Sequence, residues 1–204
     1  MGETGCHGGN PLVVVISGPS GVGKDTILER MAECGFPHHF AITATTRPPR
    51  PGEQEGVNHF FLSREKFEEL IAQGELLEHA EVYGNLYGVP RQQVRDALAN
   101  GKHVLIRVDV QGATRIRELL PDSVLIYVTP PDMETLRKHL IARGADTEEE
   151  IQRRLDRAAG ELRSAQKFDY RIVNHESRLD DAVKQVTGII EREAHSVPAR
   201  VFDV

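Results

Sequence analysis

The stretch VVVISGPSGVGKDTILERM, residues 13–31, brings glycines and a lysine together at the spacing of a phosphate-binding loop. Gly18, Gly21 and Gly23 would let successive backbone N–H groups point into one concavity. Lys24 would reach the outer phosphates of a nucleotide, and the helix that follows adds a partial positive charge. An apolar strand before the loop and a helical pattern after it favour a nucleotide site over a structural glycine-rich turn.

The residue after this lysine departs from the usual pattern. A hydroxyl normally stands there and binds Mg²⁺, whereas this chain has Asp25, with Thr26 one place later. A carboxylate about 5 Å from a phosphate, with nothing between them, would cost on the order of 1–3 kcal/mol. We therefore expect Asp25 to be screened by a metal, paired with an arginine, or turned to solvent as a first-turn helix acid.

Two arginines stand three apart in TATTRPPRPGE, residues 43–53. The prolines exclude a regular helix, so Arg47 and Arg50 are expected to lie close together in an irregular turn. Two planar guanidinium groups suit an oxyanion such as a monophosphate, and a basic surface turn is the alternative.

Two carboxylates occupy strand-like segments. Glu78, in LLEHAEVYGNLYGVP, could accept the N1–H and the exocyclic amine of a guanine edge, or remain a strand-edge acid. Asp109 ends the apolar run in VLIRVDVQGA, where phosphate-loop folds place a metal-associated carboxylate. A helix-capping acid is the alternative for Asp109.

The elements that must position these residues alternate between strand and helix. Apolar runs at 12–17, 103–108, 123–128 and 170–173 each precede a helical pattern. This order predicts an α/β fold with a parallel sheet covered on both faces.

Two segments interrupt the alternation. Between Phe40 and Gln93, prolines, glycines and a Ser63-capped helix predict an inserted substrate-binding lobe. From Ala145 to Lys167, charges alternate around sparse apolar residues, which predicts a mostly exposed, mobile helical lid.

Length and composition narrow the function classes. The 204 residues suit one well-cored domain, and a net charge of −6 excludes a general nucleic-acid binder. Cys6 and Cys34 have neither metal nor disulfide spacing, which fits a reducing compartment. Since no apolar stretch approaches the roughly 18 residues of a membrane span, we expect a cytoplasmic protein with no membrane partner.

Together these motifs resemble the guanylate kinase family over residues 12–193. The ordered signatures are ISGPSGVGK, TATTRPPRPGE, FEELIAQGELLEHAEVYGNLYG, DVQGA, LIARGADTEEEIQRRL and FDYRIVN. The resemblance implies the P-loop NTPase nucleoside-monophosphate-kinase fold, with a parallel-sheet core, an inserted GMP-binding lobe and a helical lid. It also implies Mg²⁺-dependent transfer of the ATP γ-phosphoryl group to GMP or dGMP in purine nucleotide metabolism and GMP recycling, by a monomer or homodimer.

The resemblance implies boundaries as well. A flexible leader is expected at 1–11, a kinase domain at 12–194 and a tail at 195–204. Within the kinase domain, the core is expected at 12–40, 94–140 and 168–194, the GMP-binding lobe at 41–93 and the lid at 141–167.

Residue roles carry over where residues match the family's motifs. The expected ATP-binding residues are Gly18, Pro19, Ser20, Gly21, Val22, Gly23, Lys24, Asp25, Thr26 and Asn174. The expected GMP-binding residues are Thr43, Arg47, Arg50, His59, Glu78, Tyr87 and Asp109. The expected catalytic residues are Lys24, Arg47, Asp109, Arg143 and Arg154. The expected Mg²⁺ ligands are Asp25, Thr26 and Asp109.

The chain departs from the family pattern at several of these motifs. His59 stands where the family commonly has a tyrosine that contacts the GMP phosphate, and Val89 where it has a serine or threonine that contacts guanine. His139 replaces an arginine at the base of the lid. A lost neutral hydrogen bond costs about 0.5–1.5 kcal/mol, so these changes would weaken binding without abolishing the reaction.

Arg107 is the most informative departure, because the family usually carries an acid there. It precedes Asp109 by two residues and so shares the same strand face. In phosphate-loop folds this strand runs beside the strand that carries the loop. We therefore expect Arg107 to form an ion pair with Asp25 beside the metal site, leaving Thr26 or water to complete the Mg²⁺ shell.

Two rival functions remain open on the sequence. A ribose 1,5-bisphosphate kinase also tends to carry GKD in its loop and can carry YGV. A non-catalytic guanylate-kinase-like binding module is the second rival, although such modules generally have degraded phosphate loops. Arg47, Arg50 and Glu78 favour GMP over the bisphosphate, and the intact Lys24 favours catalysis.

Overall fold

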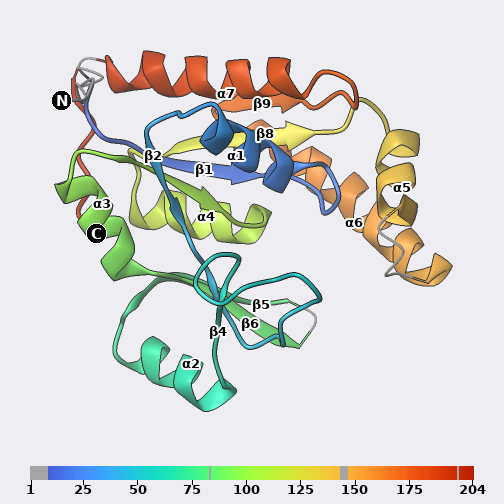
Figure 1. Ribbon diagram of the computed structural model, residues 1–204, viewed down its shortest axis with the longest axis horizontal. Coiled ribbons are helices and arrows are strands. Elements are labelled where there is room, and N and C mark those ends of the chain that lie inside the picture. The colour runs from blue at the N-terminus through green and yellow to red at the C-terminus, as the bar shows by residue number, and fades with distance from the viewer. Residues whose placement is uncertain (1–8, 83, 143–146, 197) are drawn as a thin grey trace.

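A parallel sheet forms the centre of the computed structural model, which describes residues 9–82, 84–142, 147–196 and 198–204 (Figure 1). The strand order is β2-β7-β1-β8-β9, and all neighbours pair in parallel. The strands are β1 (Val13–Ser17), β2 (His38–Ala41), β7 (His103–Arg107), β8 (Val124–Thr129) and β9 (Tyr170–Val173). The predicted α/β fold is confirmed. Only β2 was not foreseen, since its sequence HHFA has neither a continuous apolar run nor an apolar-polar alternation.

Helices cover both faces of this sheet. They are α1 (Lys24–Glu33), α3 (Arg91–Ala99), α4 (Val110–Leu119), α5 (Met133–Ala142), α6 (Glu148–Ser164) and α7 (Leu179–Ala194), with the 3-10 turn η1 (Ala165–Lys167) before β9. Successive β1 side chains point to opposite faces, so Val14 and Ile16 pack with α1, α5, α6 and α7. Val13 and Val15 pack with α3 and α4 on the other face. Because both faces are buried, the central strands β1 and β8 read as continuous apolar runs.

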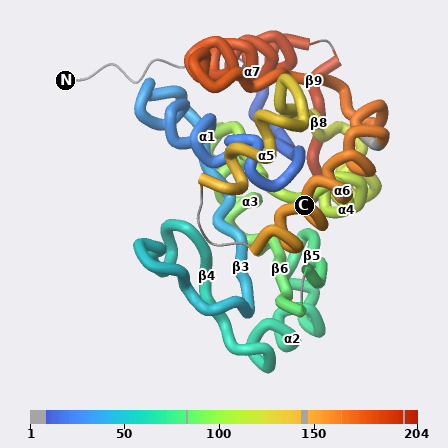
Figure 2. The backbone as a smooth tube through the Cα atoms, turned by 90° about the vertical axis from the view of Figure 1, so that its right-hand side faces the viewer, coloured from blue at the N-terminus to red at the C-terminus, as the bar shows by residue number. Residues whose placement is uncertain are grey.

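A second sheet stands apart from the core, in the lower part of Figure 2. Its strand order is β4-β3-β6-β5, and it mixes parallel and antiparallel pairs. Its elements are β3 (Ala44–Thr45), β4 (Phe60–Phe61), β5 (Leu76–Val82), β6 (Asn85–Pro90) and the helix α2 (Arg64–Ala72). Ser63 caps α2 by accepting a hydrogen bond from the Lys66 N–H, as predicted. Phe67 fills a small separate core between α2 and this sheet.

Helix α6 buries one stripe of its surface. Ile151, Leu155 and Ala158 on one face of α6 are buried against the main core. Their spacing of four and three residues forms one helical stripe, so apolar residues that look sparse in the sequence gather on one side. A capping box at Thr147 fixes where the helix begins. The boundaries of the lid, the lobe and the leader stay predictions.

The last residues return to the core. Phe202 packs beside the central sheet, and the Arg200 guanidinium pairs with Glu193 on α7. Within the described part of the chain, no helix is long and apolar enough to cross a membrane.

Candidate active site

The loop between β1 and α1 has the geometry of a phosphate cradle. Gly18 has a φ of 144°, and a Cβ there would lie 2.1 Å from the carbonyl oxygen of Val128. Gly23 ends the loop with a φ of 90° and caps α1. The Lys24 ammonium donates to the carbonyl oxygens of Gly18 at 2.6 Å and Pro19 at 2.9 Å. The loop therefore holds its lysine over its own concave side.

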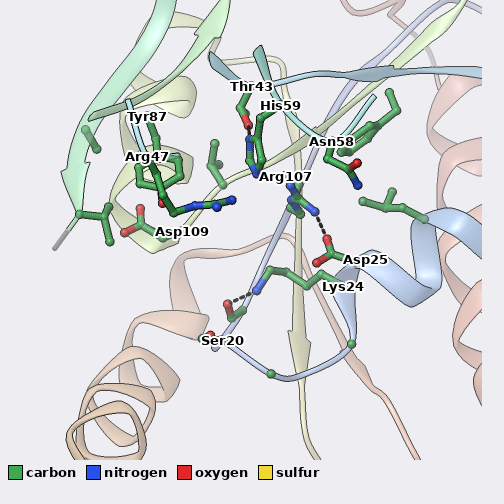
Figure 3. A pocket seen from close by; sticks show the side chains of 18 of the residues that line it. Ser20, Lys24, Asp25, Thr43, Arg47, Asn58, His59, Tyr87, Arg107 and Asp109 are labelled. Atoms are coloured by element: carbon green, nitrogen blue, oxygen red, sulfur yellow. Dashed lines mark hydrogen bonds and ion pairs between the residues drawn. The ribbon is translucent and has the colours of Figure 1, made fainter. Parts of the chain in front are cut away.

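The Asp25 carboxylate forms an ion pair with the Arg107 guanidinium, as the sequence predicted (Figure 3). Arg107 ends β7, where it lies opposite Ile16 of β1, and this register brings it beside the start of α1. The centroid of the Phe40 ring on β2 lies 5.5 Å from the Arg107 guanidinium carbon. Asp25 is thus screened by an arginine.

Asp109 lies two residues after the end of β7 and has two structural partners. One oxygen accepts from the Gly112 N–H at 2.9 Å, so Asp109 does cap helix α4. The other accepts from Nη2 of Arg157 on α6 at 2.8 Å. Nε of Arg157 also donates to Glu161 at 2.8 Å. The acid thus joins the end of the sheet to helix α6.

The arginine turn also carries its own carboxylate. Nη2 of Arg47 lies 2.9 Å from Oε1 of Glu53, and the Arg50 N–H donates to Oε2 at 2.7 Å. Burial favours a higher pKa for Glu53, but its hydrogen bonds with Arg47 and Arg50 outweigh burial and lower that pKa. Glu53 therefore stays ionised and orders the turn between the two arginines.

His59 and Thr43 form a buried pair beside this turn. The Thr43 hydroxyl lies 2.7 Å from Nδ1 of His59, and the His59 ring contacts Tyr87 edge to face. Burial, together with the positive charge of Arg47, lowers the pKa of His59 below its ordinary value. The imidazole is therefore neutral at pH 7 in the free protein.

Glu78 on β5 is a buried carboxylate with an arginine beside it. Its side chain is 3% exposed, and Nη1 of Arg115 on α4 lies 3.1 Å from Oε1. Burial raises the pKa of Glu78 to about 7, while the charge of Arg115 and its hydrogen bond act in the opposite direction.

A cavity of about 580 Å³ collects these groups at the carboxyl ends of the central strands. Among the sequence-predicted residues, the cavity is lined by Gly18, Ser20, Gly21, Gly23, Lys24, Asp25, Thr43, Arg47, Arg50, His59, Glu78, Tyr87, Asp109 and Arg154. Nη1 of Arg154 on α6 donates to the Ser20 hydroxyl at 3.0 Å, which brings α6 to the phosphate loop.

Other predicted residues lie outside the lining. Pro19, Val22 and Thr26 belong to the loop and the start of α1 but do not line the cavity. Asn174 is buried behind the loop, where its Nδ2 donates to the Val22 carbonyl at 2.9 Å. Arg143 lies outside the described residues.

His139 contacts the loop from α5. Its Nδ1 lies 3.1 Å from the carbonyl oxygen of Gly21, and its Nε2 lies 3.0 Å from Oε1 of Glu176. A histidine at this position therefore links the loop, α5 and the segment before α7.

Sequence reasoning missed three side chains at this site. Arg157 lines the cavity and holds Asp109, and its spacing of three from Arg154 on one helix was an available signal. Glu53 was already part of the quoted arginine motif. Arg115 gave no signal, because its contact with Glu78 joins segments 37 residues apart.

A phosphate loop on a parallel α/β sheet, with an arginine-lined cavity at its mouth, defines a nucleotide-binding phosphotransferase of the P-loop class. The family model for guanylate kinase matches residues 10–193. The chain therefore belongs to the guanylate kinase family.

Individual relatives agree with this assignment. The guanylate kinase of Latilactobacillus sakei is 44% identical over 94% of this chain and 94% of its own length. Guanylate kinase 2 of rice, named as chloroplastic/mitochondrial, is 43% identical over 95% of this chain and 68% of its own length. The crystal structure of guanylate kinase from Anaplasma phagocytophilum has a TM-score of 0.76 and 32% identity, covering 95% of this chain and 91% of that one.

Proposed function

We propose that this chain carries out guanylate kinase activity, the transfer of the γ-phosphoryl group of ATP to GMP, in the cavity described above. One observation carries the assignment to this cavity. The phosphate loop with Lys24 and the turn with Arg47 and Arg50 line the same cavity, so two phosphate-binding groups face one space. A site that transfers a phosphoryl group must hold the donor and the acceptor phosphate in one shared space.

The ATP side is the loop and the start of α1. Its backbone N–H groups bind the phosphates, and Lys24 turns from the Gly18 and Pro19 carbonyls to the outer phosphates. Arg154, already at Ser20, adds a second positive charge. Arg143 is proposed as a further cation on the grounds of its sequence motif.

The GMP side divides into a phosphate end and a base end. Arg47 and Arg50 bind the monophosphate, with Tyr87 and His59 as hydrogen-bonding groups beside them. Because Glu53 already fixes the turn, little side-chain ordering is left for the moment of binding.

The base end is proposed to hold guanine. Glu78, as a carboxylate, accepts its N1–H and exocyclic amine, and the Thr43 hydroxyl supplies a further contact. Val89 lies opposite Glu78 on β6 and offers no polar group, so these two side chains carry more of the recognition.

Mg²⁺ fits this site if the nucleotide supplies most of its ligands. The described residues contain no group of three His, Cys, Asp or Glu side chains placed to hold a metal. Mg²⁺ in kinases keeps several waters and takes one or two carboxylates besides phosphate oxygens. Asp25 or Asp109 would provide such a carboxylate, and the ion would neutralise charge on the outer phosphates. Thr26, exposed on α1, would complete its shell only through water.

The reaction needs no covalent intermediate. Lys24, Arg47 and Arg154 offset the charge that spreads over the transferred group, and Asp109 orients the acceptor phosphate. The donor and acceptor are held in line by the two ends of the cavity, so positioning supplies much of the rate.

A panel of nucleoside monophosphates, with ATP and Mg²⁺ and with ADP formation as the readout, tests this function. We expect turnover with GMP and dGMP, none with ribose 1,5-bisphosphate, and a loss of about 100-fold or more in Lys24→Ala. Glu78→Ala should lose purine selectivity before it loses phosphoryl transfer. Turnover of ribose 1,5-bisphosphate would overturn the proposal in favour of a ribose 1,5-bisphosphate kinase. If no ADP formation depended on both GMP and Lys24, the non-catalytic binding module would be favoured instead.

The cellular location and the choice between monomer and homodimer stay predictions. The rice relative, whose name places it in chloroplasts and mitochondria, shows that family membership does not fix the compartment.

A further inference from the structure

Arg115 approaches Glu78 from behind the cavity. It lies on α4 with its side chain 44% exposed, and it does not line the cavity that Glu78 lines. Its Nη1 lies 3.1 Å from Oε1 of Glu78 and also donates to the carbonyl oxygen of His79. The guanidinium is therefore fixed to the backbone of β5 as well as to the carboxylate.

Helix α4 has a glycine, Gly112, where it packs against the Glu78 carboxylate. A Cβ on Gly112 would lie 3.1 Å from Oε1 of Glu78, so a side chain there would crowd the carboxylate. The Gly112 N–H is bonded to Asp109, which ties this close approach to the helix cap. In the described part of the chain, Arg115 is the ion-pair partner of Glu78.

Building on the proposed base recognition by Glu78, we propose that Arg115 is a positioning residue for guanine selectivity. It holds Oε1 from the rear, so that the plane of the carboxylate is set and both oxygens face the guanine edge. A buried carboxylate without this partner would rotate or take up a proton. The protonated form presents an O–H group to a guanine edge that offers only donors at these two positions.

The test compares GMP with IMP, which keeps N1–H but lacks the exocyclic amine. In Arg115→Met we expect the KM for GMP to rise by about tenfold, because a carboxylate that is no longer held in place accepts the two guanine donors less well. The preference for GMP over IMP should fall by a similar factor. The kcat at saturating GMP should stay within about twofold, because Arg115 touches no reacting group. Arg115→Lys should recover most of the loss.

Arg117→Met is the matched control. Arg117 lies on the same helix and pairs with Asp169, away from the cavity, so its loss removes one charge and one ion pair without touching Glu78. Its KM for GMP and its GMP preference should remain at the wild-type values.

The outcomes separate this inference from the function beneath it. Equal effects of Arg115→Met and Arg117→Met on the KM for GMP, or a loss of kcat with an unchanged KM, would overturn the role of Arg115. A Glu78→Gln variant that kept full GMP preference would instead overturn base recognition by Glu78. A Glu78→Gln variant that lost this preference while Arg115→Met kept it would overturn the role of Arg115 alone. If Arg115→Met does not fold, Arg115→Gln carries the same comparison.

Discussion

Arg107 at the end of β7 pairs with Asp25 at the start of α1, so an acid beside a phosphate loop is neutralised by an arginine from the neighbouring strand. The family pattern has a hydroxyl and an acid at these two positions. This chain has an acid and an arginine instead, so the net charge of the pair is about 0, where a neutral hydroxyl and an acid carry about −1. We treat the two positions as one unit, which makes their coupling measurable.

Removing Arg107 alone should harm ATP binding more than removing both members of this pair. In Arg107→Met, Asp25 is left unscreened near the phosphates, and the KM for ATP should rise by about fivefold or more, since the repulsion is on the order of 1–3 kcal/mol. The double variant Asp25→Ser with Arg107→Met should recover most of this loss. A double-mutant cycle on the KM for ATP measures the coupling, and additive effects would show that the two residues act independently.

The KM for GMP should rise as the pH falls below about 7. Glu78, whose pKa is raised from 4.5 to about 7 by burial, must be ionised to accept two donors from guanine. In the Glu78→Gln variant, the KM for GMP should not show this rise at low pH. Since both enzymes bind the same titrating phosphate group, their difference isolates Glu78. If the KM for GMP rose equally at low pH in both enzymes, the rise would come from protonation of the GMP phosphate instead.

The same ionisation predicts a pH-dependent stability difference. The raised pKa means that the folded protein holds this proton more tightly than the unfolded chain does. Its stabilising contribution is therefore complete below about pH 4.5 and is lost as the pH rises through about 7. The free energy of unfolding of Glu78→Gln should thus improve relative to wild type as the pH is raised from 5 to 8, with ligand-free protein in chemical denaturation. A constant difference over this range would contradict the assignment.

Arg157 should matter more for catalysis than for stability. Its ion pair with Asp109 is partly exposed, so Arg157→Met should change the free energy of unfolding by less than about 1 kcal/mol. It also removes a cation from the cavity, so kcat/KM for GMP should fall by about tenfold. Arg153→Met, an exposed arginine on the same helix, is the control. If kcat/KM for GMP fell equally in both variants, the loss would reflect a general disturbance of helix α6 and would contradict a specific role for Arg157.

Asn174 should support the loop without selecting the base of the donor nucleotide. Asn174→Ala removes the hydrogen bond from Nδ2 to the Val22 carbonyl, which should cost about 1 kcal/mol of unfolding free energy. The KM for ATP should rise while the preference for ATP over GTP stays constant. A changed preference between ATP and GTP would instead place Asn174 at the base of the donor nucleotide.

Local sequence determined much of this protein. The apolar run before Gly18 makes a buried strand, glycine supplies the positive φ at Gly18 and Gly23, and Ser63 begins a helix by capping it. These features depend on interactions between residues that are close in the chain, so they can be predicted from the amino-acid sequence. The pairing of Arg107 with Asp25 was also predictable, because the strand order of a known fold class places their segments side by side.

Tertiary structure alone decided the rest. The sequence of α6 looks mostly polar, yet Ile151 and Leu155 are buried because the core supplies a face to cover them. The local sequence around Arg115 does not predict its contact with Glu78. The same holds for the contact of Arg157 with Asp109. Those contacts depend on how α4 packs on β5 and how α6 lies across the end of the sheet. Side-chain partners far apart in the chain are set by the packing of whole elements, which is a property of the folded structure.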